Sequence, residues 1–164
     1  MVVRPEPTYL AVCGPASANE QDLAWAEEVG RRIAQAGAVL VCGGLGGVMD
    51  AAARGCGSSG GTSVGIVPGD KRVDASSHLT VVVATGMGEA RNALVVKTAD
   101  AVIAISGEFG TLSEIALALK MGKPVVGLST WELHKGGSPV EAIVPASDPE
   151  SAVAAALELA RNTT

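Results

Sequence analysis

Residues 39–50, VLVCGGLGGVMD, show most directly how this chain folds. Four apolar residues, Val39–Cys42, are followed at once by a glycine-rich turn, Gly43–Gly47. A short apolar run bounded by glycines predicts a buried strand that ends in a tight turn. The residues beyond the turn, to about Gly55, fit a short helix. The stretch therefore predicts a strand-to-helix unit with a glycine loop at its junction.

The same unit recurs on both sides of this stretch. Apolar runs predict strands over Tyr9–Cys13, Val39–Cys42, Ser63–Val67, Thr80–Ala84, Ala101–Ile105 and Val125–Leu128, with a short seventh strand over Ala142–Val144. Predicted helices occupy 19–36, 48–55, 89–98 and 111–121, and a last helix begins near residue 148. This alternation predicts a doubly wound α/β fold, a mainly parallel sheet of six or seven strands with helices on both faces. At 164 residues the chain is expected to be one domain, residues 1–164.

Three details of the pattern are less determined. Residues 131–140 are expected to be irregular. The last helix has two candidate caps, a capping box of Ser147 with Glu150 and a cap by Asp148 before Pro149. Four apolar residues either pack on the sheet or form part of a subunit interface: Ile115, Leu117, Ala118 and Leu119.

The carboxyl ends of the predicted strands bring four loops to one edge of the sheet. Ligands of doubly wound sheets bind at this edge, near the point where the strand order reverses. Glycines there let a ligand approach the backbone, and the free N–H groups of a helix N-terminus suit a phosphate. The alternative for the 43–47 loop is a turn that only lets its helix pack. The candidate phosphate- or nucleotide-binding residues are Gly14, Gly43, Gly44, Gly46, Gly47, Met87, Gly107, Gly110 and Thr111.

Two charged residues at the same edge are candidates for catalysis. Arg91 falls in the first turns of the helix after the fourth strand, and Glu114 falls one turn beyond Thr111. If Thr111 lies in the first turn of its helix, Glu114 projects back toward the crevice. The ordinary alternatives are an exposed arginine and a glutamate that complements the helix N-terminus. Sequence spacing does not separate these alternatives from a catalytic pair.

Composition argues against several classes of partner. Aromatic residues make up 2% of the chain and the net charge is -5, so neither base stacking nor binding to a nucleic-acid backbone is expected. The apolar runs fall far short of the ~20 residues of a membrane span, and residues 1–7 carry no secretion signal. The three cysteines have no C-x-x-C spacing. We expect a cytoplasmic protein with no metal, no cofactor, no nucleic-acid partner and no membrane partner.

The order of these motifs resembles the Lonely Guy (LOG) family, within the superfamily it shares with the DNA-processing protein DprA. That family carries G-G-x-x-G-L-M-G, an Arg-Lys pair and P-G-G-x-G-T-x-x-E. The corresponding stretches here are 43–50 (GGLGGVMD), 91–92 (RN) and 106–114 (SGEFGTLSE). Four positions depart from the pattern: Asp50 replaces Gly, Asn92 replaces Lys, Ser106 replaces Pro and Glu108 replaces Gly.

These departures resemble a branch that includes molybdenum cofactor carrier proteins and is often labelled lysine decarboxylase. No lysine lies in the glycine-rich edge loops, which argues against that label.

The resemblance implies a Rossmann-like fold that binds a nucleoside 5′-monophosphate or a similar phosphorylated ligand. In LOG proteins the matching arginine and glutamate are catalytic, and the reaction gives a free base and ribose 5-phosphate. By that resemblance Arg91 orients the substrate or the carboxylate, and Glu114 stabilises positive charge on the ribose or activates water. The alternative is a carrier or sensor that holds a molybdenum cofactor or a nucleotide without turnover. The resemblance also implies a homodimer or a higher homo-oligomer.

Overall fold

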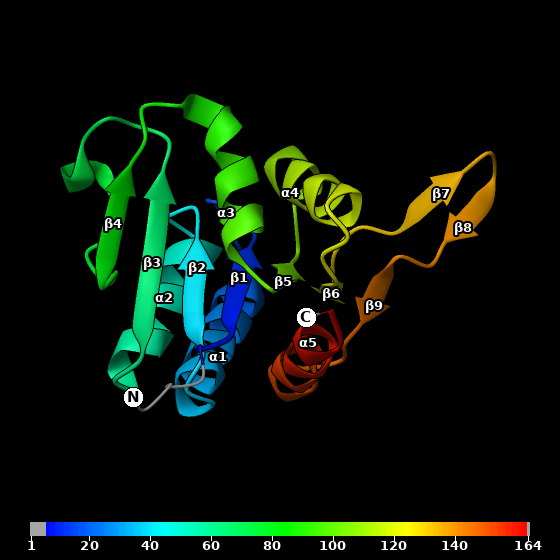
Figure 1. Cartoon of the computed structure of the whole chain (residues 1–164), viewed down its shortest axis with the longest axis horizontal. Helices are drawn as coiled ribbons and strands as arrows, with labels where there is room; N and C mark the ends of the chain where they lie inside the picture. Colours follow the sequence, from blue (N-terminus) through cyan, green and yellow to red (C-terminus); the bar gives the residue numbers. More distant parts are fainter. Residues whose placement is uncertain (1–5, 164) are drawn as a thin grey trace.

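The computed structural model describes residues 6–163 and places a seven-stranded sheet between two layers of helices (Figure 1). Its strands are β1 (Tyr9–Cys13), β2 (Val39–Cys42), β3 (Thr62–Val67), β4 (Val81–Ala84), β5 (Ala101–Ile105), β6 (Val125–Leu128) and β9 (Ile143–Pro145). The helices are α1 (Glu20–Gln35), α2 (Val48–Ser58), α3 (Asn92–Thr98), α4 (Phe109–Lys120) and α5 (Pro149–Thr163), with short 3₁₀ turns η1 (Arg72–Asp74) and η2 (Gly88–Arg91). The predicted α/β, Rossmann-like architecture is confirmed.

The strand order creates the crevice that such folds use for ligands. The order is β4-β3-β2-β1-β5-β6-β9, and every neighbouring pair is parallel. The chain moves outward from β1 to β4, then returns to the other side of β1 with β5. The order therefore reverses between β1 and β5, and the loops after these two strands flank the reversal.

The two faces of the sheet carry separate cores, because side chains of the central strands alternate. Leu10 and Val12 of β1 pack with α1, α2 and α5, whereas Ala11 and Cys13 pack with α3 and α4. Ile115 and Ala118 of α4 are fully buried in the second core, which confirms sheet packing for these two residues.

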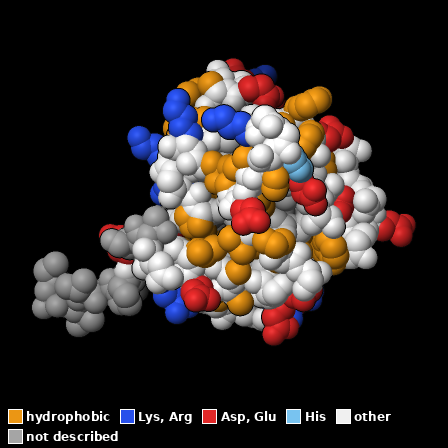
Figure 2. Space-filling view, turned by 90° about the vertical axis from the view of Figure 1, so that its right-hand side faces the viewer, with side chains coloured by type: hydrophobic (Ala, Val, Ile, Leu, Met, Phe, Trp, Pro, Cys, Tyr) orange, Lys and Arg blue, Asp and Glu red, His pale blue; other side chains and the backbone are white. Residues whose placement is uncertain are grey.

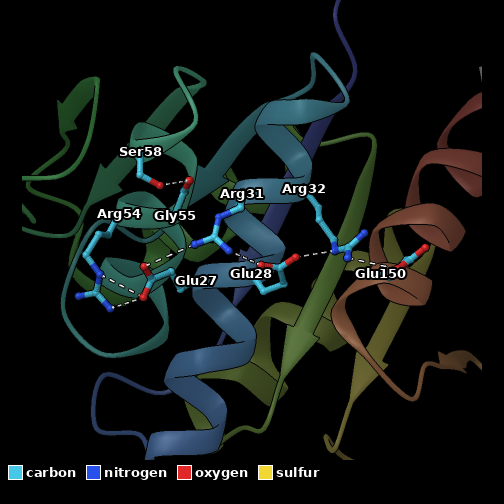
Figure 3. A network of polar contacts seen from close by, with 8 residues as sticks. All are labelled: Glu27, Glu28, Arg31, Arg32, Arg54, Gly55, Ser58 and Glu150. Carbon is cyan, nitrogen blue, oxygen red and sulfur yellow. Dashed lines mark hydrogen bonds and ion pairs between the residues drawn. The ribbon is translucent and has the colours of Figure 1, made fainter.

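Helices α1 and α2 pack closely because each contributes a glycine to the contact. A Cβ at Gly30 would lie 2.0 Å from the carbonyl oxygen of Ala52, and one at Gly55 would lie 1.9 Å from that of Glu27. Outside this contact, ion pairs join α1 to its neighbours (Figure 3). Arg54 reaches Glu27 at 2.9 Å, and Arg32 reaches Glu150 of α5 at 3.2 Å. Such exposed pairs contribute about 0–1 kcal/mol each, so apolar packing holds the layer together.

The expectation of an irregular segment over 131–140 is wrong. β7 (Leu133–Lys135) and β8 (Ser138–Val140) form an antiparallel hairpin that projects from the end of the sheet (Figure 1). Gly136 and Gly137 form its turn with φ of 60° and 82°. Positive φ at both central residues suits the twist of a two-residue hairpin turn, which glycine accepts without strain.

Several element ends also differ from the prediction. α2 continues past Gly55 to Ser58, and α4 begins at Phe109 rather than Thr111. The Ser147–Glu150 capping box is wrong, because Asp148 caps α5 and accepts a hydrogen bond from the Ser151 N–H at 2.7 Å. None of the helices within residues 6–163 is both long and apolar enough to cross a membrane.

Candidate functional site

A cavity of about 160 Å³ opens at the carboxyl edge of the sheet, where the strand order reverses. It is formed by the loops after β1, β2 and β5, by η2, and by residues at the beginning of α2, α3 and α4. Its lining residues are Gly14, Pro15, Ala16, Leu45, Met49, Glu89, Arg91, Asn92, Glu108, Gly110, Thr111 and Glu114.

Arg91 and Glu114 meet in this cavity although 22 residues separate them in the chain. Arg91 Nη1 lies 3.9 Å from Glu114 Oε1, and the two residues are 6% and 7% exposed. Arg91 is therefore not an ordinary surface arginine. Glu114 does not complete a capping box either, because the N-cap position of α4 is Glu108 and Glu114 lies in the second turn of the helix.

The pKa of Glu114 is raised to about 7, mainly by burial of the carboxyl group. The guanidinium of Arg91 and a hydrogen bond with Cys13 lower the pKa and offset part of this rise. The neighbouring Glu89 carboxylate acts in the opposite direction. Near neutral pH Glu114 is therefore present in both its protonated and its ionised form, as a general acid or base requires. Burial raises the pKa of the Cys13 thiol well above its ordinary value, so Cys13 stays protonated.

A chain of hydrogen bonds orients Arg91. Its Nη1 donates to Asn92 Oδ1, and Asn92 Nδ2 donates to Ser113 Oγ at 2.9 Å. Ser113 Oγ donates in turn to the Gly110 carbonyl at 2.7 Å. Asn92 is 4% exposed, so it joins the guanidinium to the first turn of α4 from a buried position. The amide performs this bridging where the LOG pattern has a lysine.

Three buried side-chain atoms have no hydrogen-bond partner among residues 6–163: Arg91 Nε, Thr111 Oγ1 and Trp131 Nε1. Arg91 and Thr111 line the cavity. An unpaired buried donor costs about 1–3 kcal/mol, so a ligand with acceptor oxygens is stabilised where it satisfies such atoms. Thr111 lies in the first turn of α4, where the helix N-terminus favours an anion, and Arg91 contributes the positive charge of its guanidinium.

The predicted glycines divide between the cavity and the packing around it. Gly14 and Gly110 line the cavity, and a Cβ at Gly43 would lie 2.7 Å from Arg91 Nη2. In contrast, a Cβ at Gly47 would meet the Pro15 carbonyl, whose oxygen accepts the Val48 N–H at 3.1 Å. This favours the packing interpretation for the end of the 43–47 loop.

Four other predicted residues, Gly44, Gly46, Met87 and Gly107, lie outside the lining of the cavity. Gly44 packs against β3, with a Cβ placed 2.6 Å from Val67 Cγ1, and Met87 is 48% exposed. Gly107 has φ of 145° beside Trp131. These four positions therefore do not form the cavity wall.

Five residues that line the cavity were not predicted as site residues from the sequence: Pro15, Ala16, Leu45, Met49 and Glu89. Leu45 and Met49 lie inside the glycine motif, and Glu89 lies two residues before Arg91, so their neighbours were the available signal. Pro15 and Ala16 carry no chemical signal, because they contribute only backbone and apolar surface.

A larger hollow of about 580 Å³ lies beside the β7–β8 hairpin. Trp131, Leu133, Val140 and Ile143 are among its lining residues, and apolar side chains gather on this end of the molecule (Figure 2). Neither Arg91 nor Glu114 lines it. We place the site in the smaller cavity because two of the three buried atoms that lack a partner among residues 6–163, Arg91 Nε and Thr111 Oγ1, belong to its lining together with Glu114. The third, Nε1 of Trp131, belongs to a residue that lines the larger hollow. The Phe109 ring, whose chain neighbours Glu108 and Gly110 line the smaller cavity, contacts the Trp131 ring of the larger hollow at a centroid distance of 5.9 Å.

Comparison with known proteins establishes the family. The family model described as the SLOG cluster4 family matches residues 7–153. The chain belongs to the SLOG cluster4 family. A protein of Archaeoglobus fulgidus without a characterised function is 44% identical over 119 residues, which cover 73% of this chain and 78% of that protein.

Solved structures agree with the predicted branch. The molybdenum cofactor binding protein of Rippkaea orientalis superposes with a TM-score of 0.84 at 32% identity, covering 93% of this SLOG chain and 97% of the other. The molybdenum cofactor carrier protein of Chlamydomonas reinhardtii gives 0.83 and 32%, covering 96% and 99%. DNA processing protein A of Helicobacter pylori gives 0.70 at 18% identity, covering 93% and 81%, and shares the fold alone. The predicted resemblance to the DprA/LOG superfamily and to its molybdenum cofactor carriers is confirmed.

Proposed function

We propose that the protein binds a small phosphorylated ligand in the cavity at the start of α4, with the phosphate facing Arg91 and Thr111. The observation that carries this proposal is that one cavity is lined by two residues with buried polar atoms, Arg91 Nε and Thr111 Oγ1, that have no hydrogen-bond partner in the described part of the chain. Phosphate oxygens are strong acceptors and suit both groups. The cavity of about 160 Å³ holds the phosphate end, and the rest of the ligand extends outward.

Binding is tested by calorimetry with AMP and with inorganic phosphate. Saturable binding is expected for the wild type, and Thr111→Val, which removes the hydroxyl at nearly constant volume, is expected to weaken it about tenfold. Thr130→Val is a matched control, because its hydroxyl donates to the Ser106 carbonyl outside the cavity lining. Equal affinity of Thr111→Val and wild type would contradict the assigned position of the phosphate.

Two activities fit such a site. A carrier function is supported by the two solved structures at 32% identity, whose names describe binding or carrying of the molybdenum cofactor. It is also supported by Asn92 and Glu108, which depart from the LOG pattern inside the cavity. A carrier binds a molybdopterin-like phosphorylated ligand, gains thermal stability and forms no product.

Hydrolysis of an N-glycosidic bond is supported by the Arg91–Glu114 pair and by the pKa of Glu114 near 7. In this function the phosphate positions the sugar and Glu114 stabilises positive charge on the ribose or activates water. The test is incubation with nucleoside 5′-monophosphates and chromatography for free base. Release by wild type and not by Glu114→Gln supports hydrolysis, whereas binding without release supports the carrier.

We also propose that the chain forms a homodimer or higher homo-oligomer. The apolar end of the molecule beside the hairpin supports this proposal, since Val140 and Val144 are each 40% exposed there. Light scattering coupled to size-exclusion chromatography measures the assembly directly. A cytoplasmic location stays a prediction from the sequence.

A further inference from the structure

The cavity that offers donors to a phosphate is also lined by three carboxylates, Glu89, Glu108 and Glu114. Among its lining residues Arg91 alone has a cationic side chain, and it already faces Glu114 at 3.9 Å. A phosphate monoester brings a charge of about −1.5 to −2 at neutral pH. Arg91 alone does not offset the phosphate together with these carboxylates. The charge balance of the loaded site is therefore incomplete.

Glu89 and Glu108 have no other evident role in the fold. Glu108 occupies the N-cap position of α4, yet its side chain makes no capping hydrogen bond. Within residues 6–163 neither carboxylate has a hydrogen-bond or ion-pair partner, and both side chains are exposed at the rim of the cavity. Glu89 is close enough to Glu114 to act on it electrostatically. These two carboxylates therefore belong to the lining of the same cavity as Arg91 and Thr111.

A divalent cation would resolve this imbalance. Mg²⁺ prefers oxygen ligands, keeps several waters, and is usually held by one or two carboxylates together with substrate phosphates. No group of three or more His, Cys, Asp or Glu within residues 6–163 is arranged to hold a metal ion. A cation held by Glu89 and Glu108 would therefore take its remaining oxygen ligands from the phosphate and from water.

We propose that the cavity takes its phosphorylated ligand as a complex with a divalent cation, with Glu89 and Glu108 facing the cation and Arg91 and Thr111 facing the phosphate. This inference rests on the proposed binding function. It assigns two opposed sides to the cavity: buried donors inside and unpaired carboxylates at the rim. Removing the rim charge should therefore remove the need for the cation.

The experiment is calorimetry of AMP binding in excess MgCl₂ and in EDTA at equal ionic strength. The wild type is expected to bind AMP at least tenfold more tightly with Mg²⁺. The double variant Glu89→Gln and Glu108→Gln is expected to bind AMP in EDTA more tightly than the wild type does, and to lose most of the Mg²⁺ effect. Glu158→Gln, an exposed change on α5 outside the cavity, is expected to behave as wild type.

Other outcomes overturn either this inference alone or the proposed function as well. Equal affinity with and without Mg²⁺ in the wild type overturns this inference and leaves the phosphate-binding proposal standing. Weaker binding by the double variant in both solutions overturns it too, since the carboxylates then accept hydrogen bonds from the ligand itself. Absence of AMP and phosphate binding in both solutions overturns the proposed function and this inference together. Thermal melts of the variants confirm that each is folded.

Discussion

Replacing Glu114 with glutamine tests the buried charge at the centre of the site. Burial raises the pKa of Glu114 from an ordinary 4.5 to about 7. At about 1.4 kcal/mol per pH unit, this difference corresponds to about 3 kcal/mol between the two protonation states. The folded protein holds this proton more tightly than the unfolded chain does. The stabilisation of the folded state that the bound proton provides is therefore fully present below pH 4.5 and is lost as the pH rises to about 7.

Glutamine resembles the protonated glutamate and does not ionise. Wild type and Glu114→Gln should therefore have similar free energies of unfolding near pH 4.5, and the variant should be more stable by up to about 3 kcal/mol at pH 8. For a chain of this size that corresponds to a difference in melting temperature of roughly 6–12 °C.

Urea unfolding across this pH range measures the difference, with Glu158→Gln as an exposed control expected to change little. Parallel pH profiles for wild type and Glu114→Gln would refute the reasoning that burial dominates this carboxyl group.

Three further changes test the fold and the site. Gly30→Ala places a methyl group against a backbone carbonyl of α2, so urea unfolding should show a free energy of unfolding lower by about 1–3 kcal/mol. An unchanged free energy of unfolding would contradict the close contact between α1 and α2. Asn92→Ala removes the acceptor that orients Arg91, so calorimetry should show AMP binding weakened about tenfold, and unchanged binding would exclude a positioning role. Asp148→Ala removes the cap of α5 and should lower the free energy of unfolding by about 0.5–2 kcal/mol, while no loss would show that the Ser151 N–H is satisfied otherwise.

The central strands were predictable because their signal is local. Val39–Cys42 and Ala101–Ile105 coincide with the observed β2 and β5, since each is a short apolar run bounded by turn residues. The hairpin of β7 and β8 was not predicted, because His134, Lys135 and Ser138 give it no apolar alternation. Its Gly136–Gly137 turn was the one available signal.

Helix ends were less accurate for a related reason. In the sequence Gly55 indicates the end of a helix, yet α2 continues through it to Ser58. The glycine is needed there for another reason, because a side chain at this position would collide with the backbone of α1. The two candidate caps of the last helix had similar local merit, and the structure selects Asp148.

The sequence alone predicted the α/β class and the loops at the carboxyl edge of the sheet. It also identified Arg91 and Glu114 as candidate catalytic residues. Folding in three dimensions added their meeting at 3.9 Å, the bridge through Asn92, and the separation of packing glycines from cavity glycines. Local periodicity encodes each strand and helix, because it depends on neighbours within a few residues. Contacts across the crevice depend on which strands lie side by side, and the burial that shifts the pKa of Glu114 exists only once β1 and β5 have paired.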